Sequence, residues 1–124
     1  MDAKLEDLAH RVIGAAIAVH RELGAGYLES VYEEALAAEL EIQSVPFARQ
    51  VVFGVEYGGR PVGEGRLDLL VDDEPIVELK AVEAFASIHM AQILSYLKAN
   101  KKRLGLLNNF NVPILKNGIK RVAL

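Results

Sequence analysis

The stretch that decides the fold reads Arg66-Leu67-Asp68-Leu69-Leu70-Val71-Asp72-Asp73-Glu74-Pro75-Ile76-Val77-Glu78-Leu79-Lys80. It predicts two short strands joined by an acidic turn, because apolar runs flank a cluster of turn-forming residues. Side chains alternate between faces along a strand, so Glu78 and Lys80 point the same way. If residues 72–74 form the loop, Asp68 lies opposite Glu78. Two carboxylates and one ammonium then share one face of a hairpin.

Such a hairpin favours a cation between its carboxylates. Directly opposed residues have Cβ atoms about 5 Å apart, and like charges at that distance repel by roughly 3 kcal/mol at an effective dielectric of about 20. Lys80 offsets part of this repulsion. A divalent cation would offset more, and hard oxygen ligands suit Mg²⁺ or Mn²⁺. Taken alone, the hairpin is explained slightly better by a solvent-facing surface pair of Glu and Lys that has no function. The flanking sequence therefore has to decide between the two explanations.

Composition limits the class of protein. A chain of 124 residues, 52% of them hydrophobic, has the length of one domain with a real core, and we expect residues 1–124 to form a single domain. The lack of Cys excludes disulfides, thiolate zinc sites and Cys-ligated iron–sulfur clusters. The charged N-terminus is unlike a secretory signal, and the longest apolar run, residues 12–19, is too short to span a bilayer. We therefore expect a soluble, cytoplasmic protein that has no membrane partner.

Charge is distributed unevenly along the chain. All 17 acidic residues lie before residue 84. The last third has no acid and carries half of the 14 basic residues, namely Lys98, Lys101, Lys102, Arg103, Lys116, Lys120 and Arg121. This asymmetry suggests a polyanionic partner, with nucleic acid as the natural candidate. Ordinary basic decoration of a helix end is an equally good explanation for residues 98–103.

Periodicity predicts helices over residues 3–23, 28–43 and 84–101, each with apolar side chains at helical spacing. Strands are expected over residues 49–57, 62–71, 75–82 and 104–110, followed by a short pair, 112–115 and 119–123, around the turn Asn117-Gly118. The order α-α-β-β-β-α-β-β predicts an α/β sandwich with a mixed sheet. A helix lying over this sheet would turn its polar face towards the carboxylates of the hairpin.

Several short motifs follow one another in order. They are Gly26-Tyr27-Leu28-Glu29-Ser30-Val31-Tyr32, Arg66-Leu67-Asp68, Val77-Glu78-Leu79-Lys80, His89-Met90-Ala91-Gln92 with Tyr96-Leu97-Lys98, and Leu104-Gly105-Leu106-Leu107-Asn108-Asn109-Phe110. This ordered set resembles the GxxExxY protein family, a compact branch of the PD-(D/E)XK nuclease superfamily. The resemblance covers nearly the whole chain. It implies a restriction-endonuclease-like three-layer sandwich, in which helices flank a mixed central sheet and an acidic metal site lies at the hairpin.

The resemblance also implies roles for single residues. Asp68 resembles the metal-binding aspartate of the superfamily, Glu78 its second acid, and Lys80 the lysine of its signature. Glu29 resembles the extra acid that the superfamily often places on the preceding helix, so these three acids would hold Mg²⁺ or Mn²⁺. Leu67 is a departure, since it stands where the signature has proline, the least chemical member of the motif.

The implied activity is metal-dependent hydrolysis of phosphodiester bonds in DNA or RNA. Lys80, acting with the two hairpin acids, would orient the attacking water or stabilise the transition state. Gln92 resembles the helix glutamine of several branches, and we expect it to act in catalysis with Tyr96, one turn on, contacting the substrate. Lys98, Lys102 and Arg103 would bind flanking phosphates, with an affinity that falls as salt rises.

Other polar residues have explanations that need no function. Glu29 also suits a helix N-terminus as a first-turn charge. Tyr32 and His20 fit a packed core better than a site. His89 suits the surface at least as well as an indirect role, and Arg66 would simply pair with the aspartate on its face.

Two further hypotheses stay open. The chain could be a non-catalytic module that keeps the nuclease fold and binds nucleic acid or a partner protein, as its net charge of −3 favours. It could also be an interaction protein that forms a homodimer through an exposed sheet edge or an apolar helix.

Overall fold

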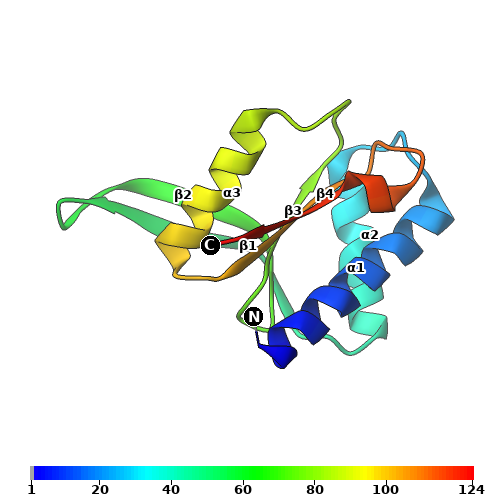
Figure 1. The fold of residues 1–124 in the computed structure, drawn as a ribbon, viewed down its shortest axis with the longest axis horizontal. Helices are drawn as coiled ribbons and strands as arrows, with labels where there is room; N and C mark the ends of the chain where they lie inside the picture. The colour runs from blue at the N-terminus through cyan, green and yellow to red at the C-terminus, as the bar shows by residue number, and fades with distance from the viewer. Residues whose placement is uncertain (1) are drawn as a thin grey trace.

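The computed structural model describes residues 2–124 (Figure 1). Helices α1 (Ala3–Leu23) and α2 (Glu29–Ile42) come first, and strands β1 (Phe47–Tyr57), β2 (Arg60–Val71) and β3 (Ile76–Lys80) follow. Helix α3 (Ser87–Asn100), strand β4 (Leu104–Asn109), the short 3₁₀ helix η1 (Leu115–Gly118) and strand β5 (Ile119–Ala123) come next. The expected α/β class and order of elements are confirmed.

The five strands form one mixed sheet in the order β1-β2-β3-β4-β5. Only β3 and β4 run parallel, and α3 makes the crossover between them. Helices α1 and α2 pack against one face of the sheet, and α3 packs against the other (Figure 1). This is the three-layer arrangement that the sequence predicted. No helix among residues 2–124 is long and apolar enough to cross a membrane.

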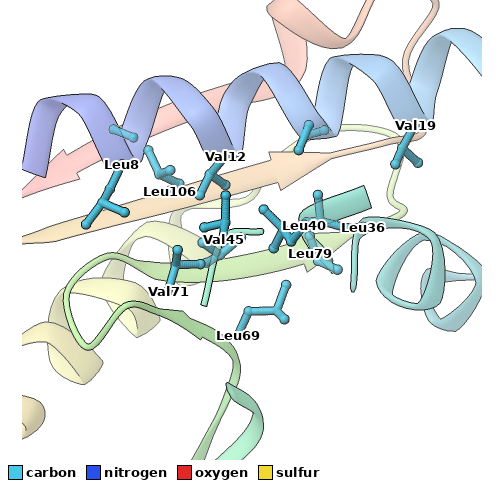
Figure 2. Packing of buried hydrophobic residues seen from close by; sticks show 14 of the residues in the cluster. Leu8, Val12, Val19, Leu36, Leu40, Val45, Leu69, Val71, Leu79 and Leu106 are labelled. Carbon is cyan, nitrogen blue, oxygen red and sulfur yellow. The ribbon is translucent and has the colours of Figure 1, made fainter. Parts of the chain in front are cut away.

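The larger core lies between the sheet and the helix pair α1–α2 (Figure 2). Leu8 and Val12 of α1 meet Leu36 of α2 and Leu79 of β3 there, all of them nearly or fully buried. Strands β3 and β4 are covered on both faces, so their residues are almost all buried. A smaller core under α3 holds six buried residues, Leu67, Ile76, Ile93, Leu97, Leu107 and Val122.

Tyr32 holds the connection between the first two helices. Its buried ring stacks on Phe110 at 4.6 Å between centroids. Its hydroxyl donates to the carbonyl of Gly24 at 2.6 Å and accepts from the N–H of Tyr27 at 3.2 Å. The expected packing role is therefore confirmed, and it determines where α2 begins, at Glu29.

His20 is a core histidine, as expected. It is 8% exposed, and its Nε2 lies 2.8 Å from the carbonyl oxygen of Val112.

One expected element is wrong. Residues 112–115 form no strand, and the chain bends there into η1. Strand β5 instead pairs antiparallel with β4. Two long-range contacts explain the difference: Leu115 is buried in the main core, and Gly118 lies so close to the backbone of Asn109 that a side chain there would clash. The Asn117-Gly118 signal therefore marks the end of a 3₁₀ turn.

Strand β3 ends two residues earlier than expected, and α3 begins three residues later. The side chain of Asn109 bonds both the N–H and the C=O of Val82, at 3.1 and 2.8 Å, and so replaces a strand partner. His89 accepts a hydrogen bond from the N–H of Ala86 through Nδ1 at 3.0 Å, and its ring packs edge-on against Phe85. His89 therefore caps α3.

Two glycines let α3 and its side chains approach the sheet closely. A Cβ on Gly105 of β4 would overlap the side chain of Ile93, which points down from α3. A Cβ on Gly65 of β2 would overlap the ring of Phe53 on the paired strand. The height of α3 above the sheet thus depends on Gly105, whereas Gly65 leaves room for the ring of Phe53, against which Tyr96 of α3 packs.

We predict that Gly105→Ala lowers the free energy of unfolding by about 1–3 kcal/mol, because it overpacks the contact with Ile93. Gly14→Ala is the matched control. Gly14 lies exposed in α1 with open space around it, so this variant should gain about 0.5–1 kcal/mol. Urea unfolding of both variants measures the difference. Equal effects at the two sites would contradict the close approach of α3.

Candidate functional site

Strands β2 and β3 part at Asp68 and Glu78. The ladder pairs Leu70 with Ile76 and Leu69 with Val77, so Asp68 comes next, opposite Glu78, as the three-residue loop predicts. Side chains replace the backbone bonds at this point. The Asp68 N–H donates to the carboxylate of Glu78 at 2.8 Å, and the N–H of Leu79 donates to the carboxylate of Asp68, also at 2.8 Å. The two carboxylates therefore fill the gap between the strands.

One nearby cation, Lys80, acts on the two carboxyl groups in this gap. Glu78 is only 4% exposed, and burial, together with the charge of Asp68, raises its pKa to about 8. Burial also raises the pKa of Asp68. The charge of Lys80 lowers both values, but Lys80 forms no ion pair within 4 Å among residues 2–124. One lysine thus acts on two carboxyl groups, of which Glu78 is buried and Asp68 is partly buried.

Glu29 reaches the same region from α2. It is the first residue of that helix, placed there by the connection that Tyr32 holds. Partial burial raises the pKa of Glu29, Lys80 lowers it, and Asp68 raises it further. The structure therefore brings Glu29 within electrostatic range of the lysine and the aspartate.

Helix α3 brings Gln92 and Tyr96 to the site from the other face of the sheet. The amide of Gln92 donates to the hydroxyl of Tyr96 at 3.2 Å, one helical turn on. The Tyr96 ring packs edge-on against Phe53 at 5.1 Å between centroids. Burial raises the pKa of Tyr96, and the charges of Glu78 and Asp68 raise it further, so the phenol lies within range of both carboxylates.

The predicted phosphate-binding cations lie elsewhere. Lys102 donates to the carbonyl of Asp73 at 2.7 Å, and Arg103 pairs with Asp2 and Glu74, each at 2.8 Å. Both precede β4, whose first residues pair with the start of β3, whereas the site lies at the end of β3. Lys98 is exposed on the last turn of α3. The structure therefore does not bring Lys102 and Arg103 to the carboxylates.

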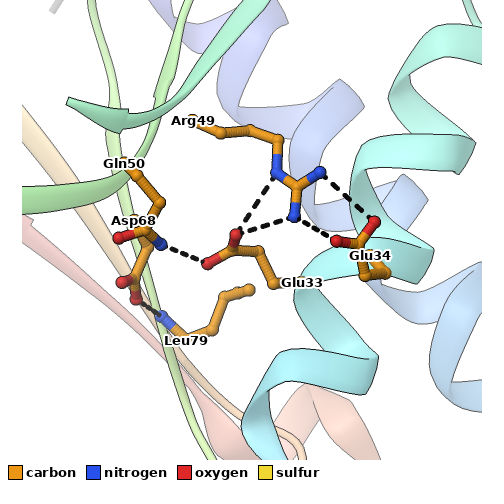
Figure 3. Close-up of polar contacts among 6 residues, drawn as sticks. All are labelled: Glu33, Glu34, Arg49, Gln50, Asp68 and Leu79. Carbon is orange, nitrogen blue, oxygen red and sulfur yellow. Dashed lines mark hydrogen bonds and ion pairs between the residues drawn. The ribbon is translucent and has the colours of Figure 1, made fainter.

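A polar network that the sequence did not predict lies beside Asp68 (Figure 3). Arg49 of β1 pairs with Glu33 at 2.9 Å and Glu34 at 2.7 Å, both on α2. Gln50 donates through Nε2 to the other oxygen of Glu33 at 2.6 Å. The charge of Glu33 contributes to the raised pKa of Asp68. The four-residue spacing of Glu29 and Glu33, which puts both on one helix face, was the available signal.

The position of Arg66 also differs from the expectation. It forms no ion pair with any described residue, so the expected pairing with Asp68 is wrong. Instead it lines a cleft of about 370 Å³ together with Val52, Glu64, Gly65 and Tyr96. A cation that faces an open cleft beside the site is available to bind an anionic ligand.

A family model described as the PD-(D/E)XK nuclease superfamily matches residues 6–122. The chain belongs to this superfamily. No curated protein matches the chain. The matched range includes every candidate site residue discussed above, from Glu29 to Arg103.

Members of the PD-(D/E)XK superfamily typically depend on a metal ion. Within residues 2–124, no group of three or more His, Cys, Asp or Glu side chains stands ready to hold one. The expected ligands Glu29, Asp68 and Glu78 therefore do not form a closed three-acid cage. The donor set of the gap still suits Mg²⁺ or Mn²⁺, because each hairpin carboxylate keeps one oxygen free of backbone bonds and Mg²⁺ retains several waters. Within residues 2–124, no Lys, Arg or His side chain forms an ion pair with either carboxylate.

We predict that stability in a chelator-containing buffer falls as the pH rises. The pKa of Glu78 is raised from 4.5 to about 8 on folding. The contribution of protonated Glu78 to the free energy of unfolding is therefore fully present below pH 4.5 and is lost progressively as the pH rises to about 8. Glu78→Gln should flatten this slope and be more stable than the wild type at pH 9. Urea unfolding at pH 5, 7 and 9 measures both effects, with Glu22→Gln at the exposed end of α1 as control. If the free energy of unfolding depends on pH equally in the wild type and in Glu78→Gln, the raised pKa of Glu78 is contradicted.

Proposed function

We propose that this chain is a metal-dependent nuclease of the GxxExxY type, in which residues 1–124 form one domain that hydrolyses phosphodiester bonds in DNA or RNA. The observation that carries this proposal is the convergence of the Asp68 and Glu78 carboxylates in the strand gap, near Lys80, which forms no ion pair with any residue from 2 to 124. Membership of the PD-(D/E)XK superfamily supports it. The motif Gly-x-x-Glu-x-x-Tyr supports the narrower family, because its Tyr32 holds the turn that presents its Glu29.

Each residue of the gap has a part in the proposed chemistry. A bound Mg²⁺ or Mn²⁺ would activate water and polarise a phosphoryl oxygen. Asp68 and Glu78 would hold the ion through the oxygens that make no backbone bonds, and Glu29 would join them from α2. The ammonium of Lys80 orients the attacking water or stabilises the charge that develops on the phosphate.

The substrate lies on the α3 side of the site. Gln92 and Tyr96 hydrogen-bond the scissile phosphate, because they are the polar groups that α3 presents near the carboxylates. Arg66 binds a neighbouring phosphate in the adjoining cleft. Lys98 remains available from the last turn of α3, whereas the ion pairs of Lys102 and Arg103 would have to open before these residues could bind phosphate.

We predict that the purified protein cleaves nucleic acid with Mg²⁺ or Mn²⁺ and that a chelator stops the reaction. Asp68→Asn and Lys80→Ala should each reduce the rate about a hundredfold or more, because each removes a group that stabilises charge in the transition state. Lys116→Ala, which changes an exposed residue of the 3₁₀ helix η1, is the control for Lys80. Gel assays on mixed DNA and RNA substrates measure the rates. Cleavage that survives both site variants would assign the activity to a contaminant.

The second candidate is a nucleic-acid-binding module without catalysis. The lack of a three-acid group among residues 2–124 favours it, because such a site would hold a metal ion weakly. Salt-dependent binding of DNA or RNA with no metal-dependent turnover would select this alternative.

We predict that Arg66→Ala weakens binding of single- or double-stranded nucleic acid. It should also reduce the slope of log Kd against log salt concentration by about one, the amount expected for the loss of one phosphate contact. Binding is measured by fluorescence anisotropy at several salt concentrations, in the Asp68→Asn background to prevent cleavage. Arg21→Ala is the matched control, because Arg21 lies exposed on α1, on the opposite face of the sheet from α3. An unchanged slope for Arg66→Ala would rule out the cleft as part of the binding surface.

A further inference from the structure

Gln50 has a backbone conformation that its position in a strand does not explain. Its φ is +50°, in the left-handed region, although it lies inside β1. The other described non-glycine residues with positive φ, Ser44, Asp72, Asp73 and Lys101, lie in turns or just after helix ends. Such strain persists only where the surroundings impose it, and it often occurs at functional sites.

The strain falls opposite the site. Arg49 pairs with Leu69 and Val51 pairs with Leu67, so Gln50 faces Asp68 across the β1–β2 ladder, and no pair forms there. Asp68 is also the residue at which β2 leaves β3. The two strands beside β2, β1 and β3, thus both lose their regular ladder pairing with β2 at Asp68. This conformation turns the side chain of Gln50 towards α2 (Figure 3).

The amide of Gln50 bonds the carboxylate of Glu33, and Gln50 itself lies across the ladder from Asp68. Nε2 donates to Glu33 at 2.6 Å, and the side chain of Glu33 is only 14% exposed. The same amide acts on Asp68, whose pKa burial raises and a hydrogen bond from Gln50 partly lowers. Arg49 holds the other side of Glu33. A neutral donor suits this place, because it bonds Glu33 beside Asp68 without supplying a positive charge that would compete with a metal ion.

We propose that Gln50 is a positioning residue of the nuclease site. Its amide bridges Glu33 on α2 and Asp68 on β2, and so holds the first turn of α2, with Glu29, at a set distance from the Asp68–Glu78 gap. This inference rests on the proposed nuclease function and adds to it a residue from β1, a strand to which neither the hairpin nor the helix motifs belong.

A simple alternative is that the left-handed conformation of Gln50 serves only to bend the hairpin formed by β1 and β2. Gln50→Gly separates the two explanations, because glycine adopts φ of +50° without strain but has no amide. We expect Gln50→Gly to unfold at the same temperature as the wild type or higher. We also expect Mn²⁺ binding to weaken at least tenfold and kcat to fall by a similar factor, with KM little changed, as when the residues that support metal ligands are removed.

Three further variants complete the experiment. Gln50→Ala should lose both stability and Mn²⁺ affinity, since it keeps the strain and lacks the amide. Gln50→Asn, which tolerates the left-handed region and keeps a shorter amide, should recover part of the affinity lost in Gln50→Gly. Ala48→Gly, at an exposed position two residues earlier on β1, is the matched control and should bind Mn²⁺ as the wild type does. Titration calorimetry with Mn²⁺ alone gives the affinities without any need for turnover.

The outcomes separate this inference from the function on which it rests. If the wild type binds Mn²⁺ and cleaves, and Gln50→Gly does both equally well, the positioning role is wrong and the nuclease proposal stands. If Gln50→Gly is less stable than Gln50→Ala, the left-handed conformation is not imposed by the site, and the inference also fails. If the wild type neither binds Mn²⁺ nor cleaves, the proposed function fails and this role falls with it.

Discussion

The exchange of hydrogen bonds between Asp68 and the strand end at Glu78 and Leu79 is the constraint on which the rest of the site depends. A buried backbone N–H needs an acceptor, and here two N–H groups find carboxylates where a regular ladder would offer carbonyls. The carboxylates are held in place for the same reason that the strands separate. The separation also affects β2 on either side of Asp68. Residues two apart on a regular strand point to the same face, but Leu67 packs under α3 whereas Leu69 packs under α1 and α2.

Two helices approach this opening from opposite faces of the sheet. Helix α2 brings Glu29 to one side, because Tyr32 holds the turn that precedes it. Helix α3 brings Tyr96 to the other side, because Gly105 leaves room for α3 and Gly65 leaves room for the ring of Phe53, on which Tyr96 packs. The site therefore forms only when all three layers are assembled, although most of its chemistry lies on a single hairpin.

Charge pairing elsewhere in the fold leaves the site short of cations. Arg103 pairs with Asp2 and Glu74, and Arg121 pairs with Glu6, so acids from the first two thirds of the chain neutralise bases from the last third. Lys80 is left to face the buried carboxyl groups of the gap. Burial without compensation is costly for an ionised carboxyl, and a divalent cation would remove that cost.

The sequence by itself determined the hairpin register, the α/β order and the superfamily. These follow from local patterns, since a three-residue loop and alternating side chains define which residues face each other. The tertiary structure alone decided the roles of Gln50 and Glu33, the pairing of Arg103 and the path of residues 112–115. Each of these depends on groups that are distant in the chain, such as Gln50 with Glu33 or Gly118 with the end of β4, and no local spacing shows which of them meet once the layers pack.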